Sequence, residues 1–247
     1  MVTFYSQFDG GDGSDPTDPS TNVQWTGYNH SATGCSMLNK NSASLYGASG
    51  LLITNVANSG TMNIYKSLSI SANASVGFWI KPIGGLNGRA FNITAMSSGG
   101  QGGTIYAYIK AANLSIANAC SVAIYQLDGT VGNTQLITSL QLAYGTWFWV
   151  TVWWTWNAST GMASNYSITP YGGSATTGST SQAAYGVPAM DTLWVGRNAT
   201  GTVNSATFYM DDYCFDLSYG AVTPPGHAAT GGPFPFFLQN QMGGLNV

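Results

Sequence analysis

Residues 146–157, TWFWVTVWWTWN, decide the fold, because they predict a long β-strand with large side chains on both faces. Successive residues of a strand point to opposite sides of the sheet. One side carries an apolar row that suits a sandwich core, namely Phe148, Val150, Val152, Trp154 and Trp156. The other carries Trp147, Trp149, Thr151, Trp153 and Thr155. Because three tryptophans are unusual on a solvent-facing row, we expect an apolar or sugar-like partner to cover them.

The composition extends this prediction to the whole chain. The 247 residues include 32 Gly, 14 Tyr and 8 Trp, which favour strands and tight turns over helices. No window keeps a helical period, and short strand-like runs alternate with turns. The predicted strands are 2–8, 43–46, 61–65, 75–81, 90–95, 104–109, 121–127, 134–139, 146–156, 164–169, 192–196 and 207–217. We therefore expect one all-β domain, an antiparallel β-sandwich, over residues 1–222, with a Gly/Pro/Phe-rich tail at 223–247.

Charge is the second unusual feature. Only 6% of the residues are charged and none is Glu, so hydroxyls, amides and glycine backbone must keep the surface hydrated. A surface of this kind suits coverage by neighbouring subunits and indicates an assembly protein. The six cations are scattered, so they predict no nucleic-acid partner. No segment resembles a signal peptide or a membrane span.

The three cysteines, Cys35, Cys120 and Cys214, are widely spaced and odd in number. This pattern favours reduced, buried thiols in a protein made in the cytosol, with one disulfide pair as the alternative.

Three fragments resemble a known family. The first, VGFWIKP at 76–82, resembles a strand of the concanavalin A-like jelly rolls, in particular the laminin-G-like group. The second, GTWFWVTV at 145–152, is similar to a later strand of that group, and LWVG at 193–196 followed by FYMDDY at 208–213 resembles its closing strands. The resemblance implies two antiparallel sheets packed face to face. It implies little about activity, because this fold carries lectins, glycanases, adhesion modules and viral proteins.

The sequence offers few of the residues that enzymatic hydrolysis needs. Glycosidases need two carboxylates that flank the bond, and this chain has no Glu, while Asp211 and Asp212 are strand neighbours that face opposite ways. The histidines, His30 and His227, lie in loop-like stretches without a nucleophile motif or a zinc-ligand spacing. We therefore predict that the chain is not an enzyme and has no cofactor.

Calcium is the one metal that the sequence allows. Asp9, Asp12, Asp15 and Asp18 supply oxygen ligands in one loop, although their spacing does not match an EF-hand. Relatives by resemblance hold Ca²⁺ at the sandwich rim, and Asp211 or Asp212 matches the acid of the family's closing strand. The alternative for the loop is a set of turns in which aspartates accept backbone hydrogen bonds, and the same alternative applies to the closing-strand acid.

Two aromatic sets are candidate contact surfaces. Trp147, Trp149 and Trp153 could stack on sugar rings, or be buried under a loop or a neighbouring subunit. Phe234, Phe236 and Phe237 in the tail could insert into a partner, or fold back on their own sheet.

Together these features predict a non-enzymatic structural virion protein of a bacteriophage, such as a capsid decoration, head fibre or tail component. It would be located in the virion, made in the host cytoplasm, and act as a homo-oligomer in contact with other virion proteins. The alternative is a lectin-like, carbohydrate-binding adhesion module that recognises a cell-surface glycan.

Overall fold

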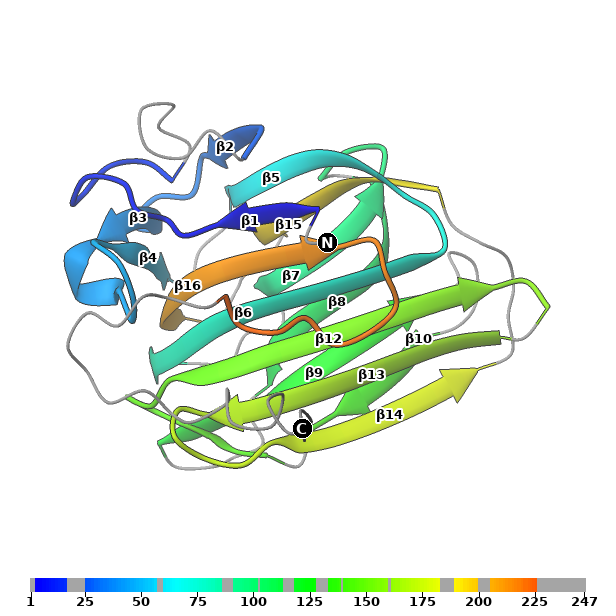
Figure 1. Cartoon of the computed structure of the whole chain (residues 1–247). Helices are drawn as coiled ribbons and strands as arrows, with labels where there is room; N and C mark the ends of the chain where they lie inside the picture. The colour runs from blue at the N-terminus through cyan, green and yellow to red at the C-terminus, as the bar shows by residue number, and fades with distance from the viewer. Residues whose placement is uncertain are drawn as a thin grey trace, which may run out of the picture.

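A computed structural model describes residues 3–16, 25–56, 60–85, 91–101, 103–112, 118–127, 133–138, 140–159, 161–182, 189–199 and 205–225. These residues form two antiparallel sheets that pack face to face, as the sequence predicted (Figure 1). The side chains of Cys35, Cys120 and Cys214 are buried, as predicted, and these three cysteines form no disulfide with one another. The predicted tail contacts Phe234, Phe236 and Phe237 lie outside the described residues.

Sheet A is the front layer in Figure 1 and runs in the order β14-β13-β12-β6-β16-β4-β3, with β1 also paired to β16. Its central strands are the longest, and β12 holds most of the tryptophan-rich stretch. The strands are β1 (Phe4–Ser6), β3 (Ser36–Lys40), β4 (Gly50–Asn55), β6 (Asn73–Gly84), β12 (Phe148–Asn157), β13 (Gly161–Pro170), β14 (Thr176–Gln182) and β16 (Ala206–Asp216).

Sheet B is the rear layer and runs in the order β10-β9-β8-β7-β15-β5-β2, with β11 also paired to β9. Its strands are β2 (Gly27–His30), β5 (Gly60–Ile70), β7 (Asn92–Ser98), β8 (Thr104–Ala112), β9 (Ala119–Leu127), β10 (Asn133–Ile137), β11 (Leu142–Ala143) and β15 (Met190–Ala199).

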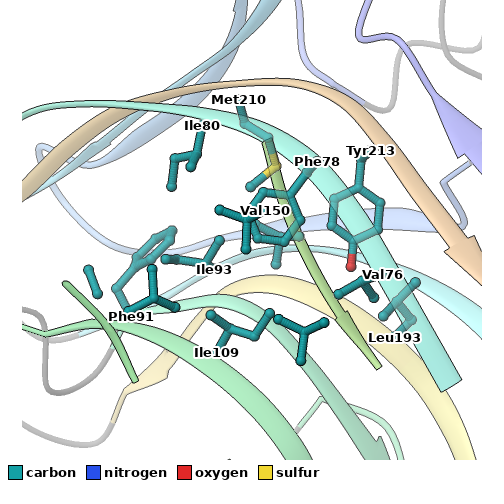
Figure 2. Packing of buried hydrophobic residues seen from close by; sticks show 14 of the residues in the cluster. Val76, Phe78, Ile80, Phe91, Ile93, Ile109, Val150, Leu193, Met210 and Tyr213 are labelled. Carbon is teal, nitrogen blue, oxygen red and sulfur yellow. The ribbon is translucent and has the colours of Figure 1, made fainter. Parts of the chain in front are cut away.

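The core lies between the sheets and contains the apolar row that the sequence predicted for β12. Val150, Val152 and Trp154 are completely buried, and Phe148 and Trp156 are nearly so. Figure 2 shows Val150 beside Phe78 from the adjacent strand β6, with residues of sheet B such as Ile109 on the other side. Tyr213 stacks on Phe78 at 5.8 Å between ring centroids. The alternation rule therefore places this strand correctly.

One predicted strand is wrong. Residues 43–46 were expected to be extended, but Asn41–Ala43 is a turn of 3-10 helix and the chain then loops over the edge of sheet A. The reason is that the carboxylate of Asp211 in β16 accepts hydrogen bonds from the backbone N–H groups of Leu45 and Tyr46. These groups are therefore not available to pair with a neighbouring strand.

Candidate functional site on the outer face of sheet B

The outer face of sheet B carries a row of polar residues that crosses five strands. The register pairs Lys110 of β8 with Asn92 of β7, Asn92 with Gly196 of β15, Gly196 with Asn63 of β5, and Asn63 with Asn29 of β2. Directly opposed residues in a sheet project to the same side. Flanking residues of these strands point into the core, so this row points outward. We call it the amide row.

A second row, two residues further along the strands, is mostly aromatic. It crosses β9, β8, β7, β15, β5 and β2 and consists, in that order, of Tyr125, Tyr108, Ala95, Trp194, Tyr65 and Gly27. Tyr108 and Tyr125 stack with ring centroids 4.3 Å apart. We call it the ring row. The small residues Ala95 and Gly27 alternate with the large ring side chains, so the surface that the two rows form is uneven in height.

Lys110 joins the two rows. Its ammonium nitrogen lies 4.6 Å from the ring centroid of Tyr108 and 5.5 Å from that of Tyr125. These distances are within the range of a cation–π interaction, which fixes the long side chain over the phenols. Burial, with a smaller contribution from Tyr125, raises the pKa of Tyr108 to about 12. Tyr108 is therefore a protonated phenol at neutral pH.

Asn92 supplies an unusual acceptor beside Lys110. It points away from the core and yet is only 6% exposed, and its Oδ1 has no hydrogen-bond partner among the described residues. A buried amide oxygen without a partner costs about 1–3 kcal/mol. This acceptor beside tyrosine and lysine calls for a partner that the described residues do not supply.

A β-bulge sets the direction of Asn92. The register of β7 shifts against both of its neighbours between residues 92 and 95. As a result Ile93 and Thr94 both face the core, where Thr94 hydrogen-bonds the hydroxyl of Tyr213, while Asn92 and Ala95 face outward. Bulges recur beside active sites because they redirect a side chain.

Gly196 is required at the centre of the amide row. Its φ is +130°, and a Cβ there would lie 2.1 Å from the carbonyl oxygen of Met62. Only glycine tolerates this conformation and approach. The neighbouring Asn63 is completely buried, and its Nδ2 donates to the carbonyl oxygen of Arg197 while its Oδ1 accepts from Asn29.

The sequence did not single out any of these residues. Tyr108, Lys110 and Tyr125 belong to two predicted strands, and their alternation with core residues was visible. What could not be read from the sequence is that β8 and β9 are neighbours in a register that superimposes the two phenols.

The tryptophans that the sequence did single out lie on the other side of the molecule, on the outer face of sheet A. Trp149 is only 4% exposed, because the chain after β16 turns back and runs across β6 and β12 (Figure 1). Its Nε1 donates to the carbonyl oxygen of Val222, whose own N–H donates to Thr151. Trp147 and Trp153 are half-buried. Their role as an interface or glycan platform stays a prediction.

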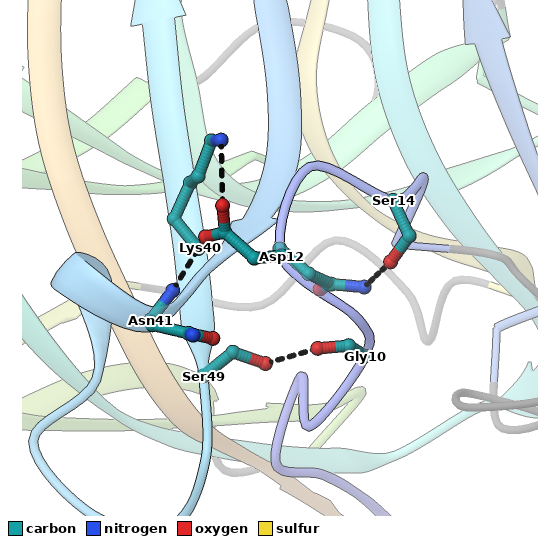
Figure 3. Close-up of polar contacts among 7 residues, drawn as sticks. Gly10, Asp12, Ser14, Lys40, Asn41 and Ser49 are labelled. Atoms are coloured by element: carbon teal, nitrogen blue, oxygen red, sulfur yellow. Dashed lines mark hydrogen bonds and ion pairs between the residues drawn. The ribbon is translucent and has the colours of Figure 1, made fainter.

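Two of the aspartates that were predicted as calcium ligands accept hydrogen bonds from backbone N–H groups. Asp9 accepts from the N–H groups of Ala48 and Ser49. Asp12 accepts from the N–H of Asn41 and pairs with Lys40 at 3.2 Å (Figure 3). These contacts, led by the Asn41 hydrogen bond, lower the pKa of Asp12.

The remaining aspartates of that hypothesis are placed differently. The backbone carbonyl of Asp15 accepts from Asn39, and Asp18 lies outside the described residues. Asp211 accepts from the loop backbone, and Asp212 accepts from the hydroxyl of Tyr5 at 2.6 Å. No group of three His, Cys, Asp or Glu side chains in the described residues is arranged to hold a metal ion. Calcium binding stays a prediction.

Comparison with known proteins gives the fold but no family. No protein-family model matches the sequence, and no curated protein matches it either. Among solved structures, the chain is similar to an endo-β-1,4-glucuronan lyase from the fungus Trichoderma reesei, with a TM-score of 0.58 and 13% identity over 87% of this chain and 95% of that one. It is also similar to a PL-14 alginate lyase from Aplysia kurodai, with a TM-score of 0.54 and 10% identity over 87% and 98%. A third similar structure is the cellulose-induced protein Cip1, with a TM-score of 0.56 and 12% identity over 89% and 100%.

These likenesses confirm the concanavalin A-like sandwich and contradict the functional prediction. The chain was predicted to be a non-enzymatic structural virion protein, with a lectin-like adhesion module as the alternative. Instead, polysaccharide lyases share its fold over most of their length, so both the virion function and the conclusion that the chain is not an enzyme are wrong. The prediction considered hydrolysis alone, which commonly uses paired carboxylates or a histidine base.

Within the described part of the chain, no helix has the length and apolar character needed to cross a bilayer.

Proposed function

We propose that this chain is a carbohydrate-active enzyme, a lyase that binds an acidic polysaccharide across the outer face of sheet B and cleaves it by β-elimination. The observation that carries the proposal is the cluster of Lys110, Tyr108 and Tyr125 directly beside the unpartnered Oδ1 of Asn92. Two of the similar structures support the substrate class, because glucuronan and alginate are both polymers of uronic acids.

Elimination in a uronic acid unit has three requirements. The negative charge of the carboxylate must be neutralised, since the proton on the adjacent carbon (C5) becomes acidic only then. A base must take that proton, and an acid must protonate the oxygen that leaves C4. The C5–H and C4–O bonds break, while a C4=C5 double bond and a new O–H bond form. No water is consumed.

Lys110 meets the first requirement. Its ammonium is held over two rings on a face with little other charge, so it can pair with the carboxylate of a bound uronate. Asn92 lies directly opposite Lys110, and its Oδ1 can accept a hydrogen bond from a hydroxyl of the same sugar unit. As charge moves onto the carboxylate during proton removal, the ammonium of Lys110 stabilises the developing dianion.

The two stacked phenols meet the other two requirements. Tyr108 is protonated because burial raises its pKa to about 12, so it gives the proton to the leaving oxygen. Tyr125 lies in the adjacent strand, 4.3 Å away between centroids, and takes the C5 proton in its phenolate form. Transfer of that proton through water to Tyr108 restores the site. Tyr65, further along the ring row, is half-buried and offers a face on which a neighbouring sugar unit stacks.

Hydrolysis is less well supported at this face. Neither the amide row nor the ring row contains a carboxylate, whereas hydrolysis of a glycosidic bond commonly uses two. Assembly into a homo-oligomer and a place in a phage particle stay predictions from the sequence.

The test is to incubate the protein with polyglucuronate, alginate and a neutral glucan, and to follow the ultraviolet absorbance of the unsaturated uronate. We expect signal with at least one polyuronate and none with the neutral glucan. Lys110→Met, which keeps an apolar chain over the rings, should lower kcat by about 10²- to 10³-fold. Lys40→Met removes a cation far from the site and is the matched control, which should retain full activity. Equal activity in both variants would contradict the assignment of Lys110.

A further inference from the structure

A row of rings and one cation crosses the outer face of sheet A, on the opposite side of the sandwich from the proposed active site. Lys81 of β6 is paired with Tyr209 of β16, and the register of β6 with β12 places Trp147 on its other side. Tyr171 continues the row beyond Trp147, since its N–H donates to the carbonyl oxygen of Trp147. With strands about 4.8 Å apart, the four positions span about 14 Å.

This row is accessible and its charge is uncompensated. Tyr171 is 41% exposed, and Trp147, Lys81 and Tyr209 are half-buried. The ammonium of Lys81 lies 5.9 Å from the ring centroid of Trp147 and 5.6 Å from that of Tyr209. In the described residues, no carboxylate lies within ion-pair distance of it.

The support beneath the row is rigid. Trp79 is 5% exposed and lies edge-on to Tyr171, Tyr46 and Trp149, at 5.9, 6.2 and 5.6 Å between ring centroids. Asp211 holds the loop of Tyr46 in place with hydrogen bonds of 2.8 and 3.0 Å to its backbone. The Nε1 of Trp79 is buried without an acceptor in the described part of the chain.

We propose that Trp147, Lys81, Tyr209 and Tyr171 form a second polysaccharide-binding surface, which holds an acidic sugar chain without cleaving it. The choice of an acidic sugar rests on the proposed function, while the existence of the surface does not.

The chemistry of the row matches this ligand. Rings set in a line stack on the C–H faces of consecutive sugar units, and a single ammonium between them pairs with a carboxylate. No phenol pair with a lysine over both rings and no opposing asparagine is found along this row, so the proposed elimination machinery is absent from it. The surface would keep a long polymer near the enzyme between cleavage events, which raises its effective concentration at the other face.

The experiment is affinity electrophoresis in gels that contain alginate, polyglucuronate or a neutral glucan. The variants are Trp147→Ala and Lys81→Met, each in a Lys110→Met background so that cleavage of the polymer is strongly slowed. The matched control is Tyr219→Ala, which removes a tyrosine that is 51% exposed. Its hydroxyl accepts a hydrogen bond from Asn165 of β13, six residues along the chain from Tyr171. Thermal unfolding of every variant verifies that it is folded.

We expect the polyuronate gel to retard the Lys110→Met protein and its Tyr219→Ala derivative equally. Trp147→Ala and Lys81→Met should each weaken the apparent affinity by about tenfold. Retardation that is unchanged in both variants would overturn the second surface, whatever the turnover assay shows. Equal retardation in the neutral glucan would overturn the acidic ligand, and concentration-dependent dimerisation that only these variants lose would assign the row to a second copy of the chain instead.

Discussion

The two outer faces of this sandwich use aromatic residues in different ways. On sheet A, Trp149 and Trp79 are buried under the chain's own C-terminal segment and loops, and only the rim of that cluster is open. On sheet B, the stacked phenols of Tyr108 and Tyr125 are half-buried and share one ammonium. The tryptophan-rich strand dominates the sequence, but the stacked phenols with one ammonium over both rings lie on the opposite face. Aromatic content alone therefore does not indicate which face carries the proposed chemistry.

The largest expected effect separates the two faces by chemistry. Tyr108→Phe and Tyr125→Phe each remove one hydroxyl and keep the ring stack, so turnover of a polyuronate should fall by about 10²- to 10⁴-fold. Tyr171→Phe makes the same change on sheet A and should leave kcat unchanged. Initial rates with a short oligosaccharide measure the difference, since such a substrate does not depend on a second surface. Loss of activity in Tyr171→Phe as well would contradict the separation.

A pair of glycine variants compares how tightly each face is built. Gly196→Ala places a Cβ at 2.1 Å from a carbonyl oxygen at positive φ, whereas Gly77→Ala on sheet A places it 2.5 Å from the ring of Trp149. We expect Gly196→Ala to lower the free energy of unfolding by about 2–4 kcal/mol and to distort the amide row. Gly77→Ala should cost about 1–3 kcal/mol, because the ring can shift.

Denaturant unfolding and kcat of the folded fraction distinguish the two glycine variants. Gly77→Ala should keep its kcat, and Gly196→Ala should lose most of it. If both retain full turnover per folded molecule, the amide row has no part in catalysis.

The sequence predicted the fold far better than the site. Alternation in residues 146–157 was sufficient to assign Val150, Val152 and Trp154 to the core, since strand geometry depends only on neighbours in the chain. Strands at the sheet edges, such as β3 and β14, were missed because their polar residues lack an apolar row.

The site depends on strand order and on a bulge, which local patterns do not encode. Lys110, Asn92 and Tyr125 come from three strands and meet only through their register. The bulge that turns Asn92 outward places two successive residues, Ile93 and Thr94, toward the core. A strict alternation would have assigned one of these two residues to the outer face. The proposed elimination chemistry was not foreseen for a separate reason, since a chain without Glu was tested for hydrolysis alone.

Asn92→Leu tests whether the buried, unpartnered amide of the proposed site lowers the free energy of unfolding. Removal of a buried, unpartnered amide in favour of an apolar side chain of similar shape should leave the free energy of unfolding unchanged or raise it by about 1 kcal/mol. The same change should lower kcat/KM by about tenfold, since a hydroxyl of the bound sugar loses its acceptor. A gain in stability together with a loss of activity is the expected signature. A marked loss of stability would show that the amide is structural.

The last prediction is a pH dependence of stability that arises on sheet A. Burial, with a contribution from Asp212, raises the pKa of Asp211 to about 8. The folded state therefore binds a proton that the unfolded state releases above its ordinary pKa near 3.8. The stabilisation is complete below pH 4 and is lost as the pH rises to about 8, with a slope of at most about 1.4 kcal/mol per pH unit. Asp211→Asn should flatten this part of the Tm profile, and an unchanged profile would show that another group titrates.

The central claim is that the outer face of sheet B breaks a glycosidic bond by elimination. Digestion of a short oligouronate in water enriched in heavy oxygen, followed by mass spectrometry, tests it directly. Elimination predicts product masses that sum to the mass of the substrate, with one unsaturated end and no heavy oxygen incorporated, and predicts that Tyr125→Phe suppresses these products. Products that carry one added water with heavy oxygen would show hydrolysis and contradict the account.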